Sequence, residues 1–311
     1  MTLMEFIRAC AIRILLSTTA VFLLTTLVFL ITTIVLAAKY RKVLRRGSES
    51  FSLAAQPLCF DVALLQNQGK REYQQDSFYL SDQNDSLLVS EKGLLAVVAD
   101  GMGGLQDGKA ISSITVDTFK KQFNACTTGE TQKFLSECVY QAESAVDAYM
   151  YASSMKGGST VVATLIRGGK LSFVSVGDSS IFLVRNNEVK LLNRYHNYAS
   201  VLSSKVRQGM ISQQEADNDP MRSRITSYIG MGEVNEIDAN TQPIALRPDD
   251  VLILCSDGVA NALGNDALLK LINAGSFSEL GTRIEENILR QDLQNQDNFT
   301  AVMIKCKTRL Q

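Results

Sequence analysis

The sequence lacks several of the residue types on which common active sites are built. It has no Trp, only 4 Pro and a single His among 311 residues. A Ser-His-Asp triad or a multi-histidine metal site would therefore depend on His196 alone. The 6 Cys residues form no Cys-x-x-Cys pair, which fits buried thiols in a reducing compartment better than a zinc ribbon or a disulfide framework. Carboxylates become the main candidates for chemistry.

The body of the chain also lacks an excess of basic residues. Residues 1–46 hold seven Lys or Arg against Glu5 alone, whereas the remainder holds 24 basic and 31 acidic residues. Nucleic-acid affinity comes mostly from Lys and Arg side chains that neutralise phosphates, so this body argues against nucleic-acid binding. With 46% hydrophobic and 20% charged residues, the composition is that of a globular protein and excludes a disordered chain.

Residues 14–38 form a long run without a charged residue, Gly or Pro. At about 1.5 Å rise per residue, such a helix exceeds the hydrocarbon core of a bilayer, so the run predicts a transmembrane helix. A cleaved signal peptide is the competing interpretation, but its apolar core would be only about 7–15 residues long. Five basic residues follow the run and two precede it. This bias predicts an inner or plasma membrane protein with a short extracytoplasmic tip (1–13), a basic flank and linker (39–58) and a cytoplasmic body.

The pattern of apolar residues in the body predicts both strands and helices. The predicted strands span 94–99, 160–166, 171–176, 181–184, 251–255 and 299–305, and the predicted helices span 109–123, 132–153 and 277–293. Gly168-Gly169 and Asn186-Asn187 are expected to form hairpin turns, because both pairs tolerate positive φ. Since helices and hairpins occur in blocks without regular alternation, the pattern favours an α+β fold. The polar residues 196–240 are expected to form an inserted, partly helical flap.

Four short segments place an Asp at the end of a strand or in a turn. They are Arg71-Glu72-Tyr73-Gln74-Gln75-Asp76, Val98-Ala99-Asp100-Gly101-Met102-Gly103-Gly104, Leu254-Cys255-Ser256-Asp257-Gly258 and Asp297-Asn298-Phe299-Thr300. Mg²⁺ and Mn²⁺ prefer oxygen ligands, so Asp side chains from separate strands can form a metal site. Taken singly, an Asp-Gly pair after an apolar run more often marks a turn.

The order of the motifs along the chain carries more information than each motif alone. Arg71 with Gln75-Asp76 comes first, and the others follow as Asp100-Gly101-Met102-Gly103-Gly104, Gly158-Ser159-Thr160, Gly177-Asp178-Ser179, Ser256-Asp257-Gly258 and Asp297-Asn298. In this order they resemble the metal-dependent serine/threonine phosphatases of the protein phosphatase 2C family, bacterial type. The resemblance covers about residues 60–306 and implies a phosphatase domain over 59–308. It implies a four-layer αββα sandwich of two antiparallel sheets flanked by helices.

The resemblance also implies a metal centre of two Mn²⁺ or Mg²⁺ ions at one end of the sandwich. Asp100 would bridge both ions, and the main-chain carbonyl of Gly101 would ligate one of them. Asp257 and Asp297 would complete the ligand shell, and Asp178 would help to hold a third ion. Asp76 is the remaining carboxylate of the set, and it would act through an ordered water or as a supporting group.

The implied reaction is hydrolysis of phosphoserine or phosphothreonine in a protein, by a water activated between two metal ions and without a phosphoenzyme. Arg71 would bind the substrate phosphate, since a guanidinium can make two parallel hydrogen bonds to it, beside the catalytic carboxylates Asp76 and Asp100. His196 is expected to be structural. The implied partners are a phosphorylated protein and a serine/threonine kinase that phosphorylates it.

Some positions depart from the family pattern without removing an expected metal ligand. They are Gln74, Leu105, Lys109 and Ser180. These departures leave open a second interpretation, a catalytically weak, membrane-anchored module that binds phosphoproteins and regulates them. Hydrolysis of a small phosphoester is a third. The retained carboxylates favour the enzyme.

Overall fold

The computed structural model describes Met4 and residues 32–33, 58–103, 107–126 and 130–308. The chain divides into two compact units, Met1–Gln56 and Pro57–Gln311. Apart from Thr32 and Thr33, the predicted membrane helix over 14–38 lies outside the described residues, as does most of the predicted linker. Within the residues that are described, no helix is long and apolar enough to cross a bilayer.

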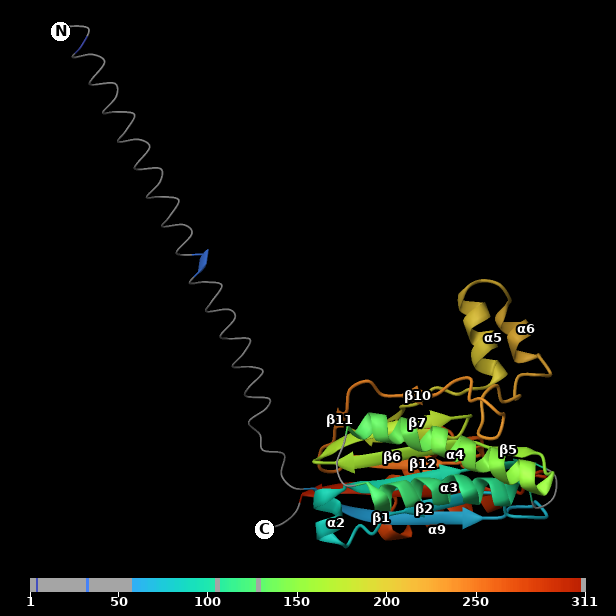
Figure 1. Cartoon of the computed structure of the whole chain (residues 1–311), viewed down its shortest axis with the longest axis horizontal. Helices are drawn as coiled ribbons and strands as arrows, with labels where there is room; N and C mark the ends of the chain where they lie inside the picture. The colour runs from blue at the N-terminus through green and yellow to red at the C-terminus, as the bar shows by residue number, and fades with distance from the viewer. Residues whose placement is uncertain (1–3, 5–31, 34–57, 104–106, 127–129, 309–311) are drawn as a thin grey trace. The chain divides into compact units, whose positions relative to one another are not determined.

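Two antiparallel sheets form the centre of the second unit (Figure 1). The first sheet has the strand order β1 (Leu58–Asn67), β13 (Phe299–Thr308), β12 (Val251–Cys255), β8 (Ser180–Arg185) and β9 (Glu188–Leu191). The second sheet has the order β10 (Asp238–Ala239), β7 (Lys170–Val176), β6 (Val161–Arg167), β3 (Leu94–Ala99) and β2 (Ser77–Leu80), with β11 (Ile244–Ala245) also paired to β7. A separate small ribbon joins β4 (Gly101–Gly103) to β5 (Gly157–Ser159).

Helices cover the outer face of each sheet. The second sheet is covered by α3 (Asp107–Ala125) and α4 (Thr131–Ser153), and the first by α8 (Asn265–Asn273) and α9 (Leu280–Arg290). The shorter helices are α2 (Ser86–Glu91), α5 (Tyr198–Arg207), α6 (Gln213–Asp217), α7 (Asp257–Ala260) and the 3-10 turn η1 (Phe277–Glu279). These layers form the αββα sandwich that the resemblance implied.

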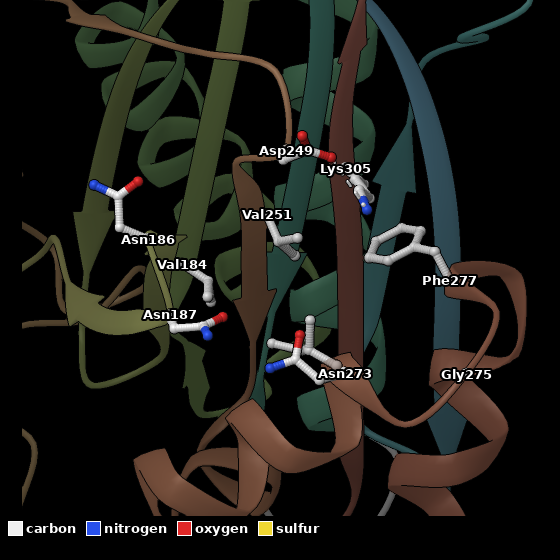
Figure 2. A pocket seen from close by; sticks show the side chains of 10 residues that line it. Val184, Asn186, Asn187, Asp249, Val251, Asn273, Gly275, Phe277 and Lys305 are labelled. Carbon is white, nitrogen blue, oxygen red and sulfur yellow. Dashed lines mark ion pairs between the residues drawn. The ribbon is translucent and has the colours of Figure 1, made fainter.

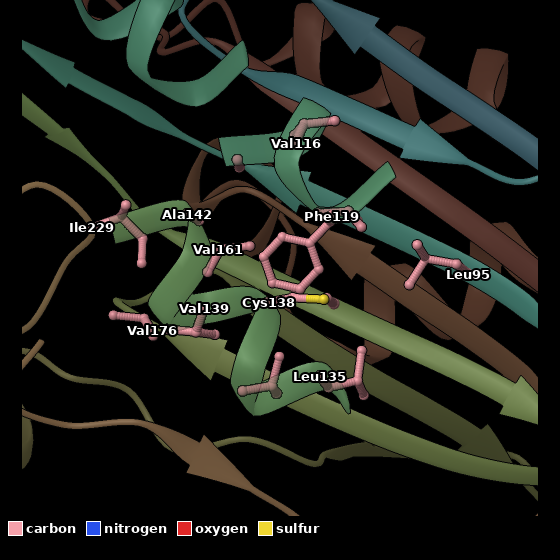
Figure 3. Packing of buried hydrophobic residues seen from close by; sticks show 14 of the residues in the cluster. Leu95, Val116, Phe119, Leu135, Cys138, Val139, Ala142, Val161, Val176 and Ile229 are labelled. Atoms are coloured by element: carbon pink, nitrogen blue, oxygen red, sulfur yellow. The ribbon is translucent and has the colours of Figure 1, made fainter. Parts of the chain in front are cut away.

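Burial on both faces explains why β3 reads as an unbroken apolar run. Leu95 and Val97 belong to the core under α3 and α4. Figure 3 shows Leu95 in this core with Phe119 and Leu135. The alternate residues, such as Leu94, face the first sheet. Since successive side chains of a strand point to opposite faces, a strand between two apolar layers needs apolar residues at every position.

The strands predicted from the sequence are all present, and their bounds agree within a few residues. Gly168 and Gly169 have φ of 57° and 71°, and Asn186 and Asn187 have φ of 53° and 61°, so both predicted hairpin turns are confirmed. The helix predicted over 277–293 was wrong at both ends, because η1 occupies its start and α9 ends at Arg290. Asp292, with φ of 46°, has left the helical conformation.

The predicted flap is partly helical, as expected, since α5 and α6 lie within 196–240. Figure 1 shows these two helices standing out from the sandwich. The C-terminal part of this region belongs to the sheet instead, because Asp238 and Ala239 pair with β7. Asn240 supports the same strand, as its Oδ1 accepts from the Phe173 main-chain N–H at 2.8 Å.

The antiparallel register brings many strand ends to one end of the sandwich. Ala99 at the end of β3 pairs with Ser77 at the start of β2. Cys255 at the end of β12 pairs with Ser180 at the start of β8 and with Ala301 near the start of β13. The residues just beyond these ends are those of the acidic motifs, so the topology gathers segments that are far apart in sequence.

Phe119→Ala is expected to lower the free energy of unfolding by about 3–5 kcal/mol, because it leaves a cavity between α3, α4 and the second sheet. Urea unfolding of residues 57–311 would measure it. The control is Tyr151→Ala on α4, whose side chain is 91% exposed, and it should change stability little. Equal effects of the two substitutions would contradict this description of the core.

Candidate active site

Five Asp residues come together at the end of the sandwich where the motifs gather. Asp100 follows β3, Asp178 lies between β7 and β8, and Asp257 begins α7 directly after β12. The other two, Asp76 and Asp297, precede β2 and β13. Asp100 interacts electrostatically with all four of the others, so the structure places them within one acidic cluster.

Asp76 is the most buried member of this cluster, with an exposed fraction of 0%. Ser256 Oγ donates a hydrogen bond to its Oδ2 at 2.8 Å. Burial raises the pKa of Asp76 to about 6, and the negative charges of Asp257 and Asp297 add to the effect. Its Oδ1 atom is buried without a hydrogen-bond partner among the described residues.

The Gly158-Ser159-Thr160 motif positions the main chain of Asp100. Thr160 Oγ1 accepts from the Asp100 main-chain N–H at 3.1 Å, and Ser159 Oγ donates to the Asp100 carbonyl at 3.0 Å. Thr160 Oγ1 also lies 2.7 Å from Ser179 Oγ, which ties in the Gly177-Asp178-Ser179 turn. Burial raises the pKa of Asp100 well above its ordinary value, and the neighbouring carboxylates, Asp76 first, raise it further.

Asp178 and Asp257 share the same environment. Burial, followed by the charge of Asp257, raises the pKa of Asp178 to about 6. Burial and the charge of Asp297 also raise the pKa of Asp257. Asp257 Oδ1 is a second buried carboxylate oxygen that has no hydrogen-bond partner in the described part of the chain.

Arg71 and Asp297 form an ion pair at the edge of the cluster, with 2.6 Å between Nη2 and Oδ2. The Arg71 side chain is 57% exposed, so its guanidinium is accessible to a ligand. Asn298 fixes the loop that carries Arg71, since its Oδ1 accepts from the Gln75 main-chain N–H at 2.8 Å and its Nδ2 donates to the Tyr73 carbonyl at 3.0 Å. No role for Asn298 was predicted from the sequence.

Gly101 is packed too tightly to carry a side chain. A Cβ atom there would lie 2.1 Å from the carbonyl oxygen of Gly108 and 2.7 Å from that of Gln75. This close approach of β4 to the start of α3 explains the glycine that follows Asp100 in the motif.

Lys109 is a member of the site that the sequence analysis noted only as a departure from the family pattern. Its Nζ donates to the main-chain oxygen of Asp76 at 2.7 Å and to Ser77 Oγ at 2.9 Å. Burial lowers the pKa of Lys109, and the Asp76 charge opposes this effect. Lys109 thus holds the Asp76 main chain and adds a positive charge beside the carboxylates.

His196 is structural, as expected. It is 4% exposed, and its Nδ1 accepts a hydrogen bond from the Gly177 main-chain N–H at 3.1 Å. Its own main-chain N–H donates to the Gly177 carbonyl at 2.9 Å. Burial lowers the pKa of the imidazole. These contacts fix the turn that precedes Asp178.

The donor atoms of the acidic cluster fit hard divalent cations. Carboxylate oxygens are the ligands that Mn²⁺ and Mg²⁺ prefer, and the buried, unpartnered oxygens of Asp76 and Asp257 are available. As the side chains stand, no three His, Cys, Asp or Glu residues among the described ones converge on one point as metal ligands. Asp297 instead faces Arg71. The chemistry of the donor set therefore supports a metal site whose ligand assignment stays a prediction.

A pocket of about 410 Å³ lies at the opposite end of the first sheet (Figure 2). Its lining includes Val184 of β8, Val251 of β12 and Lys305 of β13, residues that pair far from the acidic cluster. Its one carboxylate, Asp249, forms an ion pair with Lys305 at 3.4 Å. This pocket lacks the group of carboxylates that the acidic cluster offers.

The fold and the site together define a class of protein, an αββα sandwich with an acidic site at one end of its sheets. The sequence profile of the family described as protein phosphatase 2C matches residues 68–297. The chain therefore belongs to the protein phosphatase 2C family.

Relatives of known name agree with this assignment. The serine/threonine phosphatase stp of Listeria innocua is 26% identical over 69% of this chain and 85% of its own length. The crystal structure of the Mycobacterium tuberculosis serine/threonine phosphatase PstP/Ppp is 25% identical, with a TM-score of 0.67 over 80% of this chain and 99% of that one. The catalytic domain of PstP in complex with 2 manganese ions has the same fold, with 23% identity and a TM-score of 0.65 over 81% of this chain and 100% of that one.

The protein freed of divalent metal is expected to be more stable at about pH 5 than at about pH 7. The pKa of Asp76 is about 6 in the folded chain, against an ordinary value of 3.8. Between these values the folded chain binds more protons than the unfolded chain, so the free energy of unfolding falls as the pH rises. Asp76 alone contributes about 1 kcal/mol of this difference.

Urea unfolding of metal-free parent, Asp76→Asn and the exposed control Asp266→Asn at both pH values measures this effect. Asp76→Asn should reduce the pH dependence, and Asp266→Asn should keep it. A parent that is equally stable at both pH values would show that the carboxylates are not held in the environment described.

Proposed function

We propose that this chain is a metal-dependent protein phosphatase that hydrolyses phosphoserine and phosphothreonine in proteins. The observation that carries the proposal is the meeting of five carboxylates from separate strand ends, next to the accessible guanidinium of Arg71. Family membership, the named relatives and the oxygen-rich donor set support the same reaction.

The proposed metal ligands are the members of the acidic cluster that the family resemblance indicates. Asp100 and the Gly101 carbonyl would hold two Mn²⁺ or Mg²⁺ ions together with Asp257 and Asp297. Asp178 would hold a third ion. When bound, the ions would neutralise phosphate oxygens and make the attacking water more acidic.

The other residues of the site bind and position. Arg71 would exchange its contact with Asp297 for the substrate phosphate, because it is exposed and can donate two parallel hydrogen bonds. Asp76, held by Ser256, places a buried carboxylate close enough to Asp100 to interact with it electrostatically. Asn298 keeps the Arg71 loop beside Asp297.

Asp100→Asn and Asp257→Asn are each expected to lower phosphate release from a phosphothreonine peptide by at least about 100-fold, because each removes a charge that holds metal. The assay uses the full-length chain with Mn²⁺, and Asp266→Asn is the matched control, expected to act like the parent. A folded parent that binds phosphopeptides yet releases no phosphate would favour the regulatory module. Release from small phosphoesters alone would favour a metabolite phosphatase.

We further propose that residues 14–38 anchor the protein in the cell membrane, with residues 1–13 outside and the phosphatase domain (59–308) in the cytoplasm. The uncharged run and the five basic residues after it support this orientation. The substrates would then be cytoplasmic or membrane proteins phosphorylated by a serine/threonine kinase.

The full-length chain is expected to stay with the membrane fraction after alkaline carbonate extraction, whereas residues 57–311 should remain soluble. Protease added outside intact spheroplasts should leave the phosphatase domain uncut. Release of the full-length chain by carbonate would contradict the anchor, and digestion of the domain would contradict its orientation.

A further inference from the structure

An open groove of about 810 Å³ begins at Met102 and Gly103, close in sequence to Asp100. Apolar and basic side chains line it, and we call it the methionine groove; they are Met102, Met150, Met155, Met231, Tyr228, Arg224 and Lys156. Met102 is the second residue after Asp100, and it pairs with Gly158, the residue before Ser159. The groove therefore begins two residues along the chain from Asp100.

The walls of the methionine groove are well fixed. The base of the flap pairs with β5, since Ser159 and Ile229 exchange main-chain hydrogen bonds of 2.9 and 2.8 Å. The buried Glu143 of α4 accepts hydrogen bonds from the main-chain N–H groups of Gly230 and Gly232 at 2.6 and 2.8 Å. A groove held in this way needs little rearrangement to bind a ligand.

The exposure of the methionines is what suggests a binding surface. Four of the 9 methionines in the chain line this one groove; Met155 is exposed, and Met102, Met150 and Met231 are partly buried. Methionine is flexible and polarisable, so surfaces rich in it adapt to different apolar side chains. Ligand sites are typically hollows lined mainly by apolar side chains with a few polar groups that fix the orientation of the ligand.

The charges of the groove have one sign. Arg224 and Lys156 are exposed, and neither forms an ion pair with any side chain in the described part of the molecule. Among the described residues that line the groove, none is acidic. An occupant that complements this surface carries an acidic side chain near an apolar one.

We propose that the methionine groove receives the part of the phosphoprotein that flanks the phosphorylated residue, and that it selects a large apolar side chain accompanied by an acidic one. This inference rests on the proposed function. Asp100 and Met102 are two residues apart, so their Cα atoms lie within about 7 Å of each other. An extended substrate advances about 3.3 Å per residue, which brings the groove within a few residues of the phosphate.

The test uses the full-length chain with Mn²⁺ and a series of phosphothreonine peptides. One set of peptides compares Leu with Ala, and a second set compares Glu with Lys. In each set the substituted position is varied within about four residues of the phosphothreonine. The Leu peptide is expected to have a kcat/KM about tenfold above that of the Ala peptide at the preferred position. A small aryl phosphate, which has no flanking residues, measures catalysis alone.

Two variants with matched controls assign the preference to the groove. Met231→Asp should abolish the preference for Leu, and Arg224→Glu should reverse the preference for Glu over Lys. Met210→Asp and Arg207→Glu, exposed flap residues outside the groove, should keep both preferences. All four variants should hydrolyse the aryl phosphate like the parent.

The outcomes separate this inference from the proposed function. Turnover of all peptides at equal rates would contradict substrate selection by the groove, and so would a preference that Met231→Asp and Arg224→Glu leave intact. Neither result would contradict the proposed phosphatase activity. A folded parent that hydrolyses neither peptides nor aryl phosphate would overturn the phosphatase, and the inference with it.

Discussion

The burial of several carboxylates in one place, with the repulsion between them, is the constraint on which the rest of this structure depends. Carboxylates that share a poorly solvated site raise one another's pKa. For Asp76, Asp100 and Asp178, burial raises the pKa most, and the charges of neighbouring carboxylates raise it further. Two cations, Arg71 and Lys109, offset part of the charge. Divalent ions would offset the remainder, so the protein stores unfavourable electrostatic energy that metal binding would relieve.

Apart from the ion pair between Arg71 and Asp297, the fold holds these charges together through neutral groups. Ser256 bonds the Asp76 carboxylate, Thr160 and Ser159 hold the main chain of Asp100, and Asn298 holds the Arg71 loop. Three apolar cores, one between the sheets and one under each helical layer, supply the stability that opposes the repulsion. The repulsion between the carboxylates is therefore confined to the ends of the sheets. A charge lost or gained there lies outside the three apolar cores.

The sequence predicted those parts of the fold in which one local signal dominates. β3 and β12 are apolar throughout because both faces are buried, and Asn186-Asn187 forms its turn because Asn tolerates positive φ. β1 was missed because its residues are only half-buried and alternate irregularly. The acidic cluster was predictable from the order of its motifs, whereas Lys109 and Asn298 act through main-chain contacts with residues distant in sequence, which no local pattern reveals.

The site divides into a part that fixes the chemistry and a part that is free to vary. The carboxylates sit on strand ends whose register is set by the buried sheets, so a shift there would move core residues to the wrong face. The methionine groove lies instead between β4, β5, the end of α4 and the base of the flap, and most of its side chains are only partly buried or exposed. Substitutions in it therefore change which chain can dock without altering the acidic cluster. Selectivity for a phosphoprotein can thus evolve separately from hydrolysis, on a surface that begins two residues from Asp100.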